Sequence, residues 1–250
     1  MEKKCGCVLF VLTLRAEKKR GRNKMKKTLM ALALTGMVAC PVWAQQGGRN
    51  PLRDSLAFAA ETLALHPDSI DLRLKKASWN IELGQWEYAK SEYDYVLQRQ
   101  PGNIAGLYYR AFVNEKLGRY KFARLDYQNL LMLVPGNFEA QLGLALLNEK
   151  DHRLTEALDG INLLVAQYPD SAVAYAARGG IEKGRGMTEL AAFDYEEAAR
   201  RDPTNADYLL NLIDLQITLR RNREAYDGLR RLQQMGVSRA SLKELYERLR

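Results

Sequence analysis

Five prolines recur along this chain at one fixed interval, and this regularity restricts its possible folds more than any other feature. Each lies in a turn of similar composition (HPDS, QPGN, VPGN, YPDS or DPTN), and every interval between them is 34 residues. The five are Pro67, Pro101, Pro135, Pro169 and Pro203. Proline fixes φ and has no backbone N–H, so each turn is expected to end a regular element. A period of 20–50 residues is typical of a stacked repeat architecture.

Aligned as five units, the repeats share three columns of similar residues. The units are residues 70–103, 104–137, 138–171, 172–205 and 206–239. One column is alanine throughout, at Ala89, Ala123, Ala157, Ala191 and Ala225, and a second is small in four units, at Ala77, Ala111, Ala145, Gly179 and Ile213. A third is large and apolar, at Tyr93, Tyr127, Ile161, Tyr195 and Leu229. Small residues let two helices approach and large ones fill the space between them, so each unit is expected to be a helix pair.

A short turn separates the two helical patterns of each unit. In the second unit, apolar residues recur at helical spacing on both sides of the sequence LGRY at 117–120. Three units have glycine in this turn, at the position where a residue just past a helix end adopts positive φ; these are Gly84, Gly118 and Gly186. His152 and Arg220 occupy the same position in the third and fifth units. Each unit is therefore predicted to run helix, tight turn, helix, tight turn.

These columns resemble the tetratricopeptide repeat (TPR) family. The residues that carry the resemblance are LGQWEYAKSEYDYVLQRQP at 83–101, LGRYKFARLDYQNLLMLVP at 117–135 and LAAFDYEEAARRDP at 190–203. The resemblance covers residues 70–239 and implies an all-α fold, a right-handed α-solenoid of stacked helix-turn-helix repeats. Some positions depart from the family pattern. They are Arg73, Leu107 and Gln141 at the early aromatic, Asn80, Asn114 and Asn148 at the mid-helix tyrosine, and Val237 in place of the last proline.

The segments that flank the five units are expected to close the stack at its two ends. Residues 52–69 look like the second helix of an incomplete leading unit that ends at Pro67. Residues 240–250 are amphipathic and are expected to form a capping helix. A terminal repeat needs such a cover because each repeat buries its apolar face only against its neighbours.

The net charge of +8 belongs to the first 44 residues. They hold ten of the 38 Lys and Arg and two of the 30 Asp and Glu, so residues 45–250 hold 28 of each sign. All three cysteines lie in the same stretch. The remaining chain is charge-balanced and lacks the basic stripe that phosphate binding requires, so no nucleic-acid partner is expected.

Residues 1–44 are interpreted as a leader with the pattern of a bacterial secretory signal. From Met25, the expected start, two lysines precede an apolar run at 28–39, and the sequence Val42-Trp43-Ala44 offers small residues at positions −3 and −1 of a cleavage site. The alternative is a two-part leader or an uncleaved anchor. The sequence MVAC also resembles a bacterial lipobox, which makes Cys40 a second candidate end, with lipidation. Residues 45–51 are expected to be a linker, and the body is expected in the periplasm or at the outer membrane.

Catalytic motifs are absent from the sequence. The two histidines, His66 and His152, have no neighbouring His or Cys in metal-ligand spacing, and no phosphate loop or nucleophile elbow occurs. We therefore expect no enzyme activity, metal or cofactor. The alternative hypothesis, a solenoid enzyme or glycan-binding protein of the cell envelope, requires Glu182, Asp207 and Asp214 to converge in one cleft.

The resemblance implies that the first helix of each unit lines a concave groove. The residues expected to bind a partner there are Leu74, Tyr108, Phe112, Glu115, Leu142, Leu146 and Asp214. Their apolar centre and charged edges are typical of a site for a hydrophobic peptide or helix. The alternative is that Tyr108 and Phe112 pack onto neighbouring helices. The inward positions lack the Lys, Arg and Asn that grip a terminal carboxylate in chaperone-binding TPRs, which argues against that partner class.

The sequence thus predicts an exported, non-catalytic scaffold that binds a protein or peptide of unknown identity. Membrane contact is expected only through the signal peptide or a lipid on Cys40. The asparagines Asn80, Asn114 and Asn148 have two possible roles: a polar ladder to a ligand backbone, or bonds between adjacent helices.

Overall fold

The computed structural model describes residues 50–249, and these residues form twelve consecutive α-helices with no strand among them. The helices are α2 (Pro51–Leu65), α3 (Ile70–Glu82), α4 (Trp86–Arg99), α5 (Ile104–Lys116), α6 (Tyr120–Leu133), α7 (Phe138–Lys150), α8 (Leu154–Gln167), α9 (Ala172–Gly184), α10 (Thr188–Arg201), α11 (Ala206–Thr218), α12 (Asn222–Gln234) and α13 (Lys243–Arg248). The predicted leader, with Met25, Cys40 and Ala44, lies outside the described residues.

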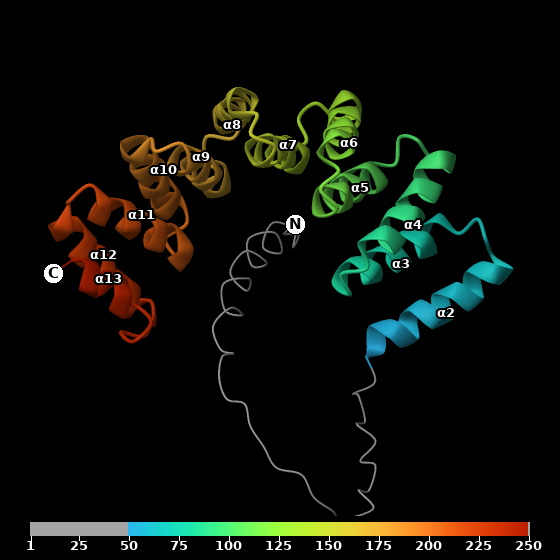
Figure 1. The fold of residues 1–250 in the computed structure, drawn as a ribbon, viewed down its shortest axis with the longest axis horizontal. Coiled ribbons are helices and arrows are strands. Elements are labelled where there is room, and N and C mark those ends of the chain that lie inside the picture. The colour runs from blue at the N-terminus through green and yellow to red at the C-terminus, as the bar shows by residue number, and fades with distance from the viewer. Residues whose placement is uncertain (1–49, 250) are drawn as a thin grey trace, which may run out of the picture. The chain divides into compact units, whose positions relative to one another are not determined.

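The helices pair into antiparallel hairpins that stack in chain order, which confirms the predicted all-α, right-handed α-solenoid (Figure 1). We call the first helix of each unit an A helix (α3, α5, α7, α9 and α11) and the second a B helix (α4, α6, α8, α10 and α12). Each A helix begins at the first residue of a 34-residue unit. Successive A helices also touch, α3 with α5, α5 with α7 and α7 with α9. Within residues 51–249 the A row lies on the inner side of the stack (Figure 1).

The proline turn both ends one hairpin and begins the next. The last residue of each turn is the N-cap of the following A helix. In four turns its side chain accepts a hydrogen bond from a backbone N–H of the first helical turn; these caps are Asn103, Asn137, Ser171 and Asn205. Such a bond satisfies one of the N–H groups that a helix start leaves unpaired. The Ser69 side chain makes no such bond.

The turn inside each hairpin has the same backbone conformation in all five units. Gly84, Gly118 and Gly186 have φ of 68°, 73° and 74°, while His152 and Arg220 have φ of 59° and 58°. The next residue donates its N–H back to a carbonyl near the end of the A helix, as Arg119 does to Asn114 at 2.8 Å. This closure is the glycine-type helix end that the sequence predicted. The third and fifth units adopt it with side chains that the left-handed region disfavours.

Small and large columns meet in the core as the sequence predicted. All five residues of the alanine column are fully buried, and the large apolar column is nowhere more than 8% exposed. The ring of Tyr127 on α6 packs over Gly143 on α7, where a Cβ would lie 2.7 Å from the tyrosine Cζ. A glycine is therefore required for this close approach between the second and third hairpins.

The C-terminal cover is a shorter helix than the sequence suggested. Within the expected segment 240–250, α13 spans six residues. Leu242 and Leu249, which flank it, are buried in the core cluster of the last hairpin. These two leucines close the apolar face of α11 and α12. In the described part of the chain, no helix has the length and apolarity needed to cross a membrane.

Candidate functional site

The aromatic residues expected to face a partner are partly occupied by packing. Tyr108 is half-buried, and its ring meets Tyr109 and Tyr127 edge-on with centroids 5.2 and 5.9 Å apart. Phe112 is only 8% exposed and meets Trp86 edge-on at 6.2 Å. The packing alternative therefore describes Phe112 well, whereas Tyr108 keeps an accessible edge.

The three leucines of the expected site are half-buried on the A helices. Leu74 packs against the core of the first hairpin, and Leu142 and Leu146 pack against the core of the third. Tyr108 on α5 is likewise half-buried, so α3, α5 and α7 each carry at least one half-buried apolar side chain of the expected site. We call this set of residues, Leu74, Tyr108, Leu142 and Leu146, the inner strip.

Charged side chains border this strip and pair with one another between units. Glu115 accepts a hydrogen bond from the Lys150 ammonium group at 2.9 Å, although the two residues are in different hairpins. The Lys116 ammonium group lies 5.0 Å from the centroid of the Phe112 ring. Glu115 and Lys116 thus lie on the same helix as Tyr108, and Lys150 lies on the same helix as Leu142 and Leu146.

Asp214 of α11, also expected at the site, forms ion pairs with residues of α9 and α13. It accepts hydrogen bonds from Lys183 of α9 at 2.5 Å and from Arg248 of α13 at 2.6 Å. Burial tends to raise the pKa of Asp214, but the hydrogen bonds from Lys183 and Arg248 outweigh it and hold the pKa below its usual value. The carboxylate therefore contributes to the joint between the last units and the C-terminal helix.

The three acids of the alternative, enzymatic hypothesis have separate environments. Glu182 is buried, and burial together with the negative charge of Asp194 on α10 raises its pKa, whereas Asp207 is exposed at the start of α11. Asp214 is held by its two cations. Among residues 50–249 no group of three or more His, Cys, Asp or Glu side chains is placed to hold a metal ion.

A repeated, partly buried ion pair, not recognised from the sequence, joins the A and B helices of three hairpins. The pairs are Lys76–Glu92, Arg110–Asp126 and Arg178–Asp194, each 16 residues apart. In the third and fifth units these positions are Leu144 with Gly160 and Leu212 with Gly228. The sequence signal was present, since a cation accompanies an acid and a leucine accompanies a glycine at this spacing in every unit.

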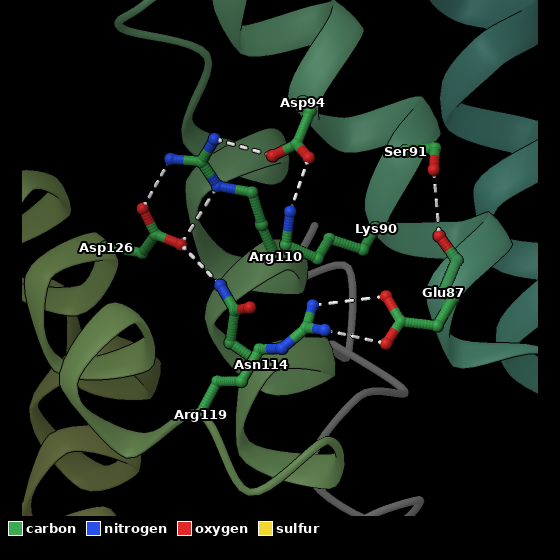
Figure 2. A network of polar contacts seen from close by, with 8 residues as sticks. All are labelled: Glu87, Lys90, Ser91, Asp94, Arg110, Asn114, Arg119 and Asp126. Carbon is green, nitrogen blue, oxygen red and sulfur yellow. Dashed lines mark hydrogen bonds and ion pairs between the residues drawn. The ribbon is translucent and has the colours of Figure 1, made fainter.

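The second hairpin shows the complete form of this network (Figure 2). Arg110 donates two hydrogen bonds to Asp126, at 3.0 and 2.6 Å, and one to Asp94 of the preceding B helix at 3.0 Å. The Asn114 carboxamide donates to Asp126 at 3.3 Å. Arg119 and Glu87 form a separate, exposed pair between neighbouring units. The network thus links α4, α5 and α6.

Asn114 and Asn148 of the asparagine column take part in such interhelical contacts. Asn80, Asn114 and Asn148 are 3%, 2% and 6% exposed. Arg124 of α6 donates to the Asn148 carboxamide oxygen at 3.0 Å and also pairs with Asp151. The structure therefore favours bonds between adjacent helices over a ladder that faces a ligand.

Two further surfaces were not anticipated from the sequence. Large apolar side chains are exposed on the B helices, and we call this set the outer patch: Tyr88, Phe122, Leu125, Met132, Leu190 and Phe193. A shallow pocket of about 370 Å³ lies on the first hairpin beside α2, lined by Leu56, Lys76, Asn80, Gln85, Tyr88 and Glu92. None of the residues expected to bind a partner lines this pocket.

Comparison with known proteins identifies the fold. No family model matches the chain. No curated protein matches it either. Among solved structures, a tetratricopeptide repeat protein from Parabacteroides merdae is 23% identical with a TM-score of 0.63, and the match covers 80% of this chain and 78% of that one. PilW, described as a widely conserved type IV pilus biogenesis factor, is 19% identical with a TM-score of 0.65. The match covers 75% of this chain and 88% of PilW.

A third structure, YrrB, is described as a TPR protein with an unusual peptide-binding site. It is 17% identical with a TM-score of 0.51, and the match covers 71% of this chain and 91% of that one. The chain therefore has the fold of tetratricopeptide repeat proteins. At these identities the likeness establishes the fold alone, and no enzyme family is indicated.

Proposed function

We propose that this protein is a non-catalytic scaffold that binds an apolar peptide segment or helix of a partner protein along its inner strip. The observation that carries the proposal is a row of half-buried apolar side chains on successive A helices, bordered by Glu115, Lys116 and Lys150. Half-buried aromatic and aliphatic anchors with a charged rim are the arrangement that concentrates binding energy in protein interfaces. The peptide-binding description of YrrB supports the same mode of action.

The inner strip sets requirements for its partner. Tyr108, Leu142 and Leu146 lie on neighbouring A helices, so a bound segment needs apolar side chains at intervals along its length. Glu115 and Lys150 pair with each other, and each is available to a residue of opposite charge only if this pair opens.

The test compares two matched double variants in affinity capture from cell-envelope extract. Tyr108→Ala with Leu142→Ala removes the centre of the inner strip, and Phe122→Ala with Met132→Ala removes an equal number of side chains from the outer patch. We expect a captured protein to be retained by the wild type and the outer variant and lost from the inner variant. Thermal unfolding of each variant checks that the fold is intact.

The opposite pattern, with capture lost only in the outer variant, would place the binding surface on the B helices. Retention of the same protein by both folded variants would exclude the inner strip as its site. Loss of Phe112 is a poor test, because its buried ring supports the core beside Trp86.

We also propose that the protein is exported and acts in the cell envelope. Support comes from the charged and apolar pattern of residues 25–44 and from the description of PilW as a pilus biogenesis factor. Intact mass and N-terminal sequencing of the mature protein test this. An end at residue 45 indicates signal cleavage after Ala44, and a lipidated Cys40 indicates a membrane anchor. A mature end before Met25 would contradict the proposal.

A further inference from the structure

The fourth hairpin differs from the others by one buried acid in a column that is otherwise neutral. The column is Asn80, Asn114, Asn148, Glu182 and Gln216, and none of the five is more than 8% exposed. Four are carboxamides, which carry the same hydrogen-bond donor at every pH. Glu182 alone has a donor only when its carboxyl group holds a proton.

The acid beside Glu182 is arranged as in the second hairpin. Asp194, on α10, receives two hydrogen bonds from Arg178 at 2.6 and 2.8 Å. Asp126 receives two from Arg110 in the same way, and it takes a third from the Asn114 carboxamide (Figure 2). Glu182 stands where Asn114 does, one turn along the A helix from the arginine.

We propose that Glu182 is a proton-controlled latch between α9 and α10, closed when its carboxyl group donates a hydrogen bond to Asp194 and released when that proton leaves. In the closed state, a protonated Glu182 supplies the donor that Asn114 supplies in the second hairpin. In the released state, two carboxylates face one guanidinium group in a buried site. The repulsion is relieved when Glu182 turns toward water or when α9 moves away from α10.

The groups around Glu182 favour the protonated form. Burial is the largest cause and the negative charge of Asp194 is the next, and together they raise the pKa of Glu182 to about 7, although Arg178 acts in the opposite direction. One carboxylate oxygen of Glu182 is buried without a hydrogen-bond partner. Such an oxygen is costly for an ionised carboxylate and tolerable for a neutral carboxyl group.

Other elements packed against α9 place an apolar residue and an acid along this helix. In the preceding unit, Arg124 donates a hydrogen bond to Asn148, the residue equivalent to Glu182. The residue equivalent to Arg124 on α8 is Leu158, which has no charge to offer. On α7, Glu149 lies beside Gly184. Two further titratable groups on or beside α9 are Lys183, which is paired with Asp214 of α11, and Tyr195 of α10, whose hydroxyl lies near Gly180.

The latch makes the stability of the protein fall as pH rises. A carboxyl group whose folded-state pKa is raised binds its proton in the folded chain while the unfolded chain has lost it. This difference exists between the ordinary glutamate pKa of 4.5 and the raised pKa of about 7. In that window the folding equilibrium constant decreases by up to about tenfold per pH unit because of this one group, and the decrease ends above it.

The test measures urea unfolding of wild type and Glu182→Gln from about pH 5 to about pH 8. The glutamine has a permanent donor and no titration. We expect the ratio of the two folding equilibrium constants to shift in favour of the variant as pH rises, most steeply below about pH 7. A constant ratio across this range would overturn the proposal.

Two further measurements keep the test decisive if Glu182→Gln folds poorly. Carbon-13 NMR follows the side-chain carboxyl of Glu182 in the wild type, and a titration midpoint near that of an exposed glutamate would refute the latch. Asn114→Glu builds the same arrangement beside Arg110 and Asp126. We expect it to introduce a new pH-dependent loss of amide exchange protection in α5 and α6, and an unchanged pH profile would count against the proposal. The inference does not depend on the proposed partner site.

Discussion

The side chain of Tyr127 on α6 closely approaches Gly143, a glycine inside α7, where the second and third hairpins pack together. A Cβ on residue 143 would lie 2.7 and 2.9 Å from two carbons of the tyrosine ring and 2.9 Å from its hydroxyl oxygen. Tyr127 is 2% exposed, so its ring is enclosed by the core on its other sides. We therefore expect Gly143→Ala to lower the free energy of unfolding by about 1–3 kcal/mol, as overpacked cores do.

Gly180→Ala is the matched control for this substitution. Gly180 is also inside an A helix, but a Cβ added there would lie 3.5 Å from its nearest neighbour, the Tyr195 hydroxyl, which is an ordinary contact distance. Alanine there is expected to raise the free energy of unfolding by about 0.5–1 kcal/mol, because glycine weakens a helix interior. Urea unfolding measures both. Equal effects of the two variants would refute the role assigned to Tyr127.

The repeated ion pair predicts that a second substitution can restore the stability lost when its cation is removed. Arg110→Leu leaves the buried Asp126 carboxylate without its cation, and we expect a loss of about 3–5 kcal/mol of unfolding free energy. Adding Asp126→Gly recreates the Leu144 and Gly160 combination of the third unit. We expect the double variant to recover much of the loss in urea unfolding. A double variant no more stable than Arg110→Leu would show that the two combinations are not interchangeable.

Glycine at position 152, in the turn inside the third hairpin, should raise the free energy of unfolding. His152 has φ of 59°, in the left-handed region that costs an ordinary residue about 1–2 kcal/mol. His152→Gly removes this cost but adds freedom to the unfolded chain, so we expect a net gain of about 0.5–1 kcal/mol in the free energy of unfolding. The reverse change, Gly118→Ala at φ of 73°, should lower it. Thermal melting of the pair checks the opposite signs, and shifts in the same direction would contradict the prediction.

The proline turns predict unequal effects of alanine at their last residue. The Asn137 side chain accepts from the Ala140 N–H at 2.8 Å, so Asn137→Ala should cost about 1 kcal/mol of unfolding free energy. Ser69 occupies the same place without a side-chain cap bond, and Ser69→Ala should have little effect. Urea denaturation distinguishes the two. A comparable loss at Ser69 would mean that the cap bond is not the cause.

The fold could be predicted from the sequence because the residues that determine its turns and helix contacts recur at equivalent positions in five units. Glycines at one turn, alanines at one helix contact and prolines at one interval report backbone geometry directly. The site was harder to predict. Whether Phe112 faces a ligand or Trp86 depends on side-chain packing between units, which spacing alone does not specify. The ion pairs were readable in principle, since Arg110 and Arg178 share a column and so do Asp126 and Asp194.

The N-cap at the end of each proline turn also affects how such a chain can change its length. Asn103 and Asn137 each finish one hairpin and accept a hydrogen bond from one N–H in the first turn of the next, so a segment cut between two such turns carries both of its own boundaries. Duplication or deletion of a 34-residue segment in frame keeps an N-cap residue before every A helix and leaves the proline turns intact. Genetic recombination can therefore lengthen or shorten this array in whole hairpins, while the leucines beside α13 remain as its terminus.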